Sequence, residues 1–170
     1  SWLHNGSYRL RKISDALLDG ATQRFIDLGG SKDNVTLYEV PGAFEIPGTV
    51  KTIIDNGSEY DAIVSLGCII KGETAHFEYI SSSVTDSLSN LSISCKCHIP
   101  LIYGILTTYD YQQAIERSNP NKKNKGGEVI SSAIDAIETY QKINQKKIDL
   151  YQKYIFILIL ILISFIFRYL

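Results

Sequence analysis

The stretch CIIKGETAHFEYI, residues 68–80, concentrates groups that can bind an anion and move a proton. Its apolar start is followed by an ammonium, a carboxylate, a hydroxyl and an imidazole, carried by Lys71, Glu73, Thr74 and His76. If a helix begins near Thr74, its unpaired backbone N–H groups and the positive end of its dipole can hold a phosphate. A neutral imidazole in the same first turn can accept a proton near pH 7. The stretch therefore predicts a phosphate-binding turn that also carries a proton-transfer group.

A purely structural interpretation of these residues stays open. Thr74 can serve only as a helix cap, and His76 can be a partly buried surface histidine. The sequence contains neither a P-loop nor a GxGxxG pattern, which excludes the commonest nucleotide sites. The residue types alone indicate a phosphate-handling protein and go no further.

Two other clusters can contribute to a site. Phe44 and Glu45, in the loop PGAFE, suit stacking and hydrogen bonding to a flat heterocycle, although a packed turn that starts a helix explains them equally well. Arg117 and Lys125 flank a polar loop and can donate to a phosphate, Arg117 in bidentate fashion. For lysines in this loop, including Lys125, solvated surface charge is the simpler explanation.

Length and charge limit the class of protein. At 170 residues the chain fits one domain with a substantial core, and its net charge of −1 argues against a general nucleic-acid binder. Its three cysteines, Cys68, Cys95 and Cys97, show no disulfide pattern and fit a reducing compartment such as the cytoplasm. Cys95 and Cys97 stand next to His98, but no second ligand pair accompanies them, so we expect no metal.

Hydrophobic periodicity predicts alternating helices and strands. Helices are expected at 13–28, with Ser14 as a cap and Gly29 and Gly30 as the stop, and at 46–56, 76–93, 111–117 and about 129–140; strands are expected at 35–40, 62–66 and 101–106. This alternation is typical of an α/β fold with a mostly parallel sheet. Ligands bind such sheets at the carboxyl ends of the strands, which places the site in the loops after Val40, Leu66 and Leu106.

Both ends of the chain depart from this alternation. Residues 1–12 are mostly polar or basic and show no strand pattern. Residues 155–167 form an apolar run shorter than the roughly 20 residues that a spanning helix needs. A marginal membrane anchor with lysines on its near side and an aggregation-prone extension are both open interpretations. We divide the chain into a divergent segment 1–12, a domain 13–142 and a polar then apolar tail 143–170.

Several long motifs resemble the 6,7-dimethyl-8-ribityllumazine synthase family of riboflavin biosynthesis. They occur in the family's order from about Leu17 to Tyr140, which makes the resemblance highly specific. The matching segments are LLDGA at 17–21, VPGAFEIP at 40–47, YDAIVSLGCIIKGETAHFEYI at 60–80, IPLIYGILTT at 99–108, QAIER at 113–117 and NKGGE with SAIDAIE at 124–138.

The resemblance implies both a fold and an activity. The fold would be a three-layer α/β/α sandwich around a four-stranded parallel, flavodoxin-like sheet. The activity would be the condensation of 5-amino-6-(D-ribitylamino)uracil with 3,4-dihydroxy-2-butanone 4-phosphate, releasing phosphate and water, without a cofactor. Family members assemble as pentamers, in some cases as icosahedral shells of twelve pentamers, with each site shared between adjacent subunits. Small-molecule substrates and copies of the same chain are therefore the expected partners.

The same resemblance assigns roles to individual residues. His76 would transfer the proton, with Arg117 and Lys125 completing the catalytic set around the phosphate. The substrate-binding positions would be Ala43, Phe44 and Glu45 for the ribityl chain and ring, Cys68, Ile69 and Ile70 for the pyrimidine, Glu73, Thr74 and Arg117 for the phosphate, and Tyr103 from across the subunit interface.

One departure from the family concerns the N-terminus. Members begin with a central strand of the type IGIVVARFN, whose Phe stacks on the pyrimidine. Here Tyr8, Arg9 and Leu10 align with its Arg-Phe-Asn, so the first strand is missing or replaced and the stacking Phe is absent. A non-catalytic pentameric or shell-forming relative that binds flavin or lumazine is therefore the alternative to an enzyme.

Overall fold

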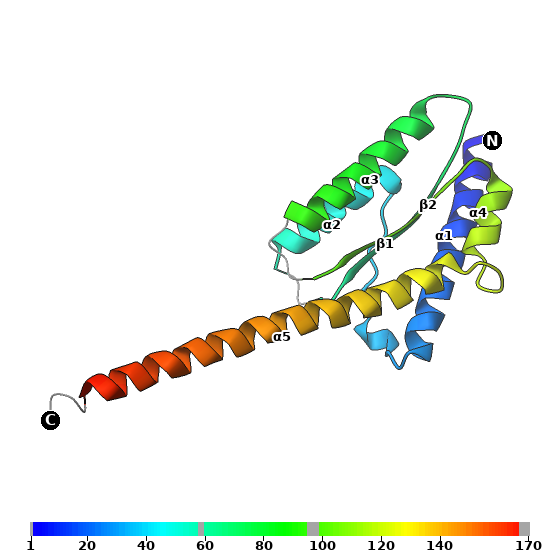
Figure 1. The fold of residues 1–170 in the computed structure, drawn as a ribbon. Helices are drawn as coiled ribbons and strands as arrows, with labels where there is room; N and C mark the ends of the chain where they lie inside the picture. The colour runs from blue at the N-terminus through cyan, green and yellow to red at the C-terminus, as the bar shows by residue number, and fades with distance from the viewer. Residues whose placement is uncertain (1, 58–59, 95–98, 167–170) are drawn as a thin grey trace.

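The computed structural model describes the backbone of residues 2–57, 60–94 and 99–166, and the side-chain environments of residues 10–57, 60–94 and 99–146 (Figure 1). Helices and two parallel strands alternate along most of the chain, which confirms the α/β class. Cys95, Cys97 and His98 lie outside the described residues. Within the described residues, no group of His, Cys, Asp or Glu side chains could hold a metal ion.

The sheet consists of strands β1 (Ile63–Ile70) and β2 (Leu101–Thr108), paired in parallel from Ile63 opposite Leu101 to Ile70 opposite Thr108. Side chains of β1 alternate between two apolar cores, as the period of two in a strand requires. Ile63 and Ile69 join one core, and Leu66, Cys68 and Ile70 pack against the other. A strand covered on both faces explains the nearly continuous apolar run in the sequence.

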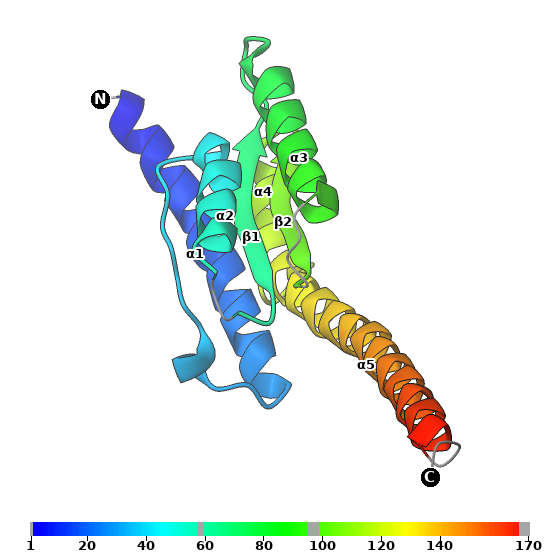
Figure 2. The same cartoon turned by 90° about the vertical axis from the view of Figure 1, so that its left-hand side faces the viewer.

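Helices cover both faces of the strand pair (Figure 2). One face carries α2 (Ile46–Asp55) and α3 (His76–Ser94), whose Ile46, Val50, Val84 and Leu88 are buried. The other face carries α1 (Trp2–Asp27), α4 (Tyr111–Ser118) and the start of α5 (Lys125–Ile166). This arrangement gives the expected three layers, and the expected helices 46–56, 76–93 and 111–117 are confirmed to within two residues.

The N-terminal segment is helical and continuous with the first expected helix. Helix α1 begins at Trp2, so Ser14 lies inside it, and the Ser14 hydroxyl donates to the Leu10 carbonyl at 3.3 Å. The prediction of Ser14 as an N-cap is therefore wrong. The predicted stop is confirmed, because α1 ends at Asp27 and Gly29 adopts a φ of 90°, which favours glycine.

The sheet has two strands in the described part of the chain, fewer than the four of the family pattern. The expected strand 35–40 is wrong: this segment follows the short helix η1 (Lys32–Asn34) and pairs with no strand. Its apolar side chains Val35, Leu37 and Tyr38 are 44%, 54% and 54% exposed. The physical reason is that a strand needs a neighbouring strand to pair with. The family pattern expects a central strand from the N-terminal residues, but residues 2–12 are helical here, so among the described residues no strand lies between the segment 35–40 and β1.

Helix α5 is a single helix of 42 residues that continues well past the sheet (Figure 1). Its first turns pack on α1 and β2, with Val129 and Ala133 buried. Among the residues that the structure describes, no helix is long and apolar enough to cross a membrane.

The contact between α1 and α5 depends on Gly126. A Cβ atom at this position would collide with the backbone of Leu17 and Ala21 in α1. We expect Gly126→Ala to lower the free energy of unfolding by about 1–3 kcal/mol, because neither helix backbone can yield cheaply. Gly48→Ala in α2 is the control, since nothing lies within 4 Å of a Cβ there, and it should be neutral or stabilising. Chemical denaturation measures both, and equal stability of the two variants would contradict the packing argument.

Candidate functional site

A cavity of about 490 Å³ opens at the carboxyl end of β1. Six of the residues predicted for the site line it: Ala43, Cys68, Ile69, Ile70, Thr74 and His76. Six further residues complete its walls: Leu10, Lys71, Gly72, Phe77, Ile80 and Tyr111. Residues from α1, β1, α3 and α4 and from the short helix η2 (Ala43–Glu45) thus meet at the place where α/β sheets bind ligands.

The turn between β1 and α3 positions the polar side of the cavity. The Lys71 N–H donates to the Thr108 carbonyl at 2.9 Å and so continues the strand pairing beyond Ile70. Helix α3 then begins at His76, and the exposed residues 72–75 lead into its first turn. The first N–H groups of a helix have no partner within the helix, so this turn can receive an anion. His76 is exposed to solvent beside it.

Cys68 contributes an apolar wall to the cavity. Its side chain is partly buried between the strands and the α1–α4 core, and this burial raises the pKa of the thiol to about 11, despite a hydrogen bond with Thr108 that lowers it. The thiol is therefore protonated at neutral pH. It suits contact with a flat ring and does not suit nucleophilic attack.

This raised pKa predicts slow alkylation of Cys68. At pH 8 about one thiol in a thousand is ionised when the pKa is about 11, against roughly a quarter for a free cysteine of pKa near 8.5. We expect iodoacetamide to modify Cys68 at least about a hundredfold more slowly than a cysteine-containing peptide. The rate should rise about tenfold per pH unit up to pH 10, as followed by peptide mass spectrometry. A rate equal to that of the peptide would contradict the assignment.

Lys71 places an ammonium at the rim of the cavity, next to one carboxylate and two aromatic rings. Its ammonium lies 3.0 Å from the Glu78 carboxylate, 5.9 Å from the centre of the Phe77 ring and 5.7 Å from that of Tyr109. The hydrogen bond from Lys71 is the main cause that lowers the pKa of Glu78. A positive charge is thus held at the rim, on the side that also carries Thr74 and His76.

Phe44, Glu45, Glu73, Tyr103, Arg117 and Lys125 do not line the cavity within one chain. Phe44 is 58% exposed and the Glu45 side chain folds back toward Gly42. The Tyr103 hydroxyl lies 3.0 Å from that of Thr85, on a face of β2 that is 38% exposed at Tyr103. Arg117 is exposed in the last turn of α4, and Glu73 is exposed in the turn before α3.

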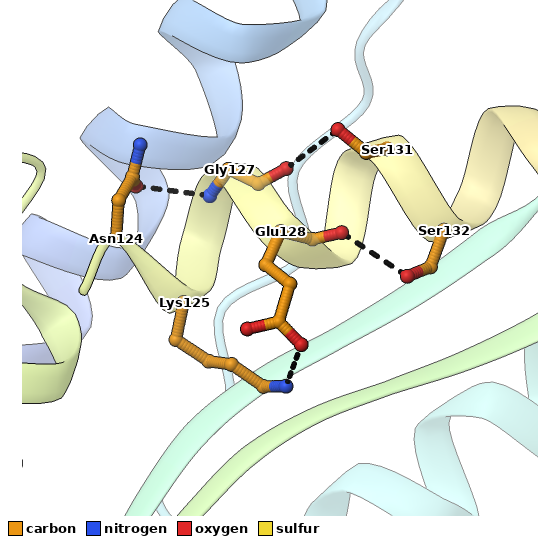
Figure 3. A network of polar contacts seen from close by, with 6 residues as sticks. All are labelled: Asn124, Lys125, Gly127, Glu128, Ser131 and Ser132. Atoms are coloured by element: carbon orange, nitrogen blue, oxygen red, sulfur yellow. Dashed lines mark hydrogen bonds and ion pairs between the residues drawn. The ribbon is translucent and has the colours of Figure 1, made fainter.

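The NKGGE motif has a clear structural role (Figure 3). The side-chain oxygen of Asn124 accepts from the Gly127 N–H at 3.0 Å and caps the start of α5, and Asn124 itself has a φ of 41°. The Lys125 ammonium pairs with Glu128 at 2.6 Å, so its charge is engaged within the helix. The motif thus builds the α5 terminus and its contact with α1, whatever Lys125 does toward a substrate.

Sequence reasoning missed several residues of the cavity wall. Leu10 reaches the site because α1 starts earlier than its periodicity suggested, and Tyr111 does so from the first turn of α4. The signal for Ile80 was present, since it follows His76 by four positions and so shares its side of a helix, and Phe77 lies three positions before Ile80.

The protein is an α/β protein whose two parallel strands are covered by helices on both faces. Its cavity lies at the carboxyl end of β1, where proteins of this class bind small ligands. The sequence model described as 6,7-dimethyl-8-ribityllumazine synthase matches residues 9–141. The chain belongs to the 6,7-dimethyl-8-ribityllumazine synthase family.

Individual relatives agree with this membership. The protein of that name from Helicobacter hepaticus is 42% identical over 131 residues, which is 77% of this chain and 82% of the relative. The one from Campylobacter jejuni subsp. doylei is 40% identical over 125 residues, 74% and 79% of the two chains. The one from Chloroherpeton thalassium is 36% identical over 130 residues, 76% and 82% of the two chains.

Proposed function

We propose that this protein is an enzyme that makes 6,7-dimethyl-8-ribityllumazine from 5-amino-6-(D-ribitylamino)uracil and 3,4-dihydroxy-2-butanone 4-phosphate. The observation that carries the proposal is that the cavity at the carboxyl end of β1 gathers Ala43, residues 68–70, Thr74 and His76. The relatives, all named for this activity, support it over a non-catalytic relative that only binds flavin or lumazine.

Different residues of the cavity contact different parts of the substrates. Cys68, Ile69 and Ile70 offer an apolar wall for the pyrimidine, and the turn at Gly72 and Thr74 receives the phosphate. The amine of the pyrimidine attacks the ketone, and an imine forms with loss of one water. Phosphate then leaves by elimination and a carbonyl group forms. The ribitylamino nitrogen attacks this carbonyl carbon, and the ring closes with loss of a second water.

His76 is the group that moves protons in these steps, since it lines the cavity at the start of α3, directly after the phosphate turn. The protein forms no covalent bond in this scheme. Holding the two substrates in contact and shuttling protons supply the acceleration.

We propose that a second copy of the chain completes the site, within a pentamer. The positions of Tyr103 and Arg117 support this, because both are exposed and neither lines the cavity of its own chain. Copies that share a site would bring such residues to a neighbour's cavity. We propose the cytoplasm as the compartment. We also propose a domain 13–142 as the catalytic unit, with 143–170 as an addition to it and 1–12 as an N-terminal segment whose residues 2–12 extend α1 and contribute Leu10 to the cavity wall.

The experiment is to mix the purified full chain with both substrates and to identify the product by its absorbance and mass, with each substrate omitted in turn. Formation of lumazine with one phosphate released per product supports the proposal. A folded protein that binds lumazine in a titration but forms none contradicts it and favours the binding-only relative.

A further inference from the structure

We infer that Lys71 is a phosphate-positioning residue of the cavity and that Glu78 holds it in place until phosphate arrives. This inference rests on the proposed function, whose phosphate-bearing substrate would use the adjoining turn. Lys71 lies in the matching segment 60–80, where the resemblance gives it no role, and the inference assigns it one together with a partner, Glu78.

The location of Lys71 provides the first argument. It is the first residue after β1 and the last whose N–H still pairs with β2, so its backbone is fixed by the sheet. Its side chain lines the cavity together with Gly72, Thr74 and His76. A charge anchored in this way stands directly beside the turn where an anion would bind.

The surroundings of the ammonium provide the second argument. Phe77 and Tyr109, whose ring centres are 6.4 Å apart, both lie within 6 Å of the Lys71 nitrogen, a distance at which aromatic faces attract cations. The rings do not take up its N–H donors, and within the described residues Glu78, at 3.0 Å, is its one charged partner. The side chain is thus oriented without being enclosed.

The third argument is the exchange of one anion for another. The Lys71–Glu78 pair is about half exposed on both sides, so it is weak and easily broken. A phosphate ester carries nearly two negative charges at neutral pH and offers three acceptor oxygens, against one charge on Glu78. The flexible lysine stem can turn from the carboxylate to the phosphate without any change in the backbone.

The test is the affinity of the full-length protein for inorganic phosphate, measured by calorimetry at low ionic strength. We expect Lys71→Gln to weaken binding about tenfold and Lys71→Arg to stay within about threefold of the wild type. Glu78→Gln should tighten binding about two- to fivefold, because it removes the competing anion. A merely structural ion pair would not produce opposite effects from its two partners.

Lys51→Gln is the matched control, because Lys51 forms a similar exposed pair with Asp55 on α2 and does not line the cavity. It should leave phosphate affinity unchanged. Circular dichroism establishes that each variant is folded. Equal phosphate affinities of the wild type and Lys71→Gln would overturn the inference, and so would a wild type that binds no phosphate. If Lys71→Gln binds phosphate more weakly but Glu78→Gln binds it as the wild type does, the role of Glu78 is overturned.

This measurement needs no turnover, so it separates the two proposals. If the variants change phosphate affinity as expected but the protein makes no lumazine, the role of Lys71 is supported and the proposed enzymatic function is contradicted. If the protein makes lumazine but Lys71→Gln leaves its phosphate affinity unchanged, the enzymatic function is supported and the role of Lys71 is contradicted.

Discussion

Replacing His76 with alanine is expected to lower kcat for lumazine formation by about a hundred- to ten-thousandfold, the usual contribution of a positioned acid–base group. The reason is chemical. Among the described residues that line the cavity, His76 carries the one imidazole, a group suited to accept and return a proton, and burial holds Cys68 as a thiol. KM should change by less than about threefold, because the substrate contacts assigned to the wall and the phosphate turn remain.

The control for this prediction is Tyr79→Ala, three residues further along α3, where the side chain is 74% exposed and does not line the cavity. Its kcat should equal that of the wild type. Steady-state rates from lumazine absorbance across pH 6–9 measure both variants. A His76→Ala protein with more than a third of the wild-type kcat would show that proton transfer does not depend on this residue.

The largest expected loss of stability follows from Leu17→Ala in α1. Leu17 is 0% exposed and packs with Ile13, Leu106 and Ala114 between α1, the sheet and α4. Truncating a fully buried leucine leaves a cavity that the surrounding helices fill only in part. We expect the free energy of unfolding to fall by about 2–5 kcal/mol.

Leu28→Ala removes the same atoms from a leucine that follows α1 and is 44% exposed. It should cost less than about 1 kcal/mol. Urea unfolding at one fixed protein concentration compares the two, because assembly makes stability depend on concentration. Similar urea midpoints of unfolding for both variants would mean that α1 does not form part of the core that contains Leu17, Leu106 and Ala114.

Sequence patterns predicted the elements whose signal is local. The apolar positions of α2, α3 and α4 recur at helical spacing, and β1 and β2 are apolar runs, so all five begin within one residue of the expected position. The expected ends of the strands are wrong: β1 continues four residues past Leu66 to Ile70, and β2 two residues past Leu106 to Thr108.

The location of the site followed from the parallel sheet, because Cys68 lies near the carboxyl end of β1 and His76 follows that strand. Ala43 joins them from η2, although the strand expected before it is wrong.

Features that depend on a neighbouring segment were not predictable in this way. The segment 35–40 has a strand-like sequence, yet a strand forms only beside a partner, and residues 2–12 provide a helix instead. Leu10 enters the cavity for that reason. The contributions of Tyr103 and Arg117 depend on a second copy of the chain, which no local pattern in one sequence can place.

The rate of lumazine formation by the wild-type protein, measured beside an Ala43→Phe variant, tests the central claim most directly. Ala43 is half-buried in the wall of the cavity, and a benzyl group there would occupy the space proposed for the substrates. The account predicts lumazine formation by the wild type and a rate at least about a hundredfold lower for the filled cavity, with the fold retained. A wild type that makes no lumazine, or an Ala43→Phe variant that is equally fast, would contradict the assignment of the chemistry to this cavity.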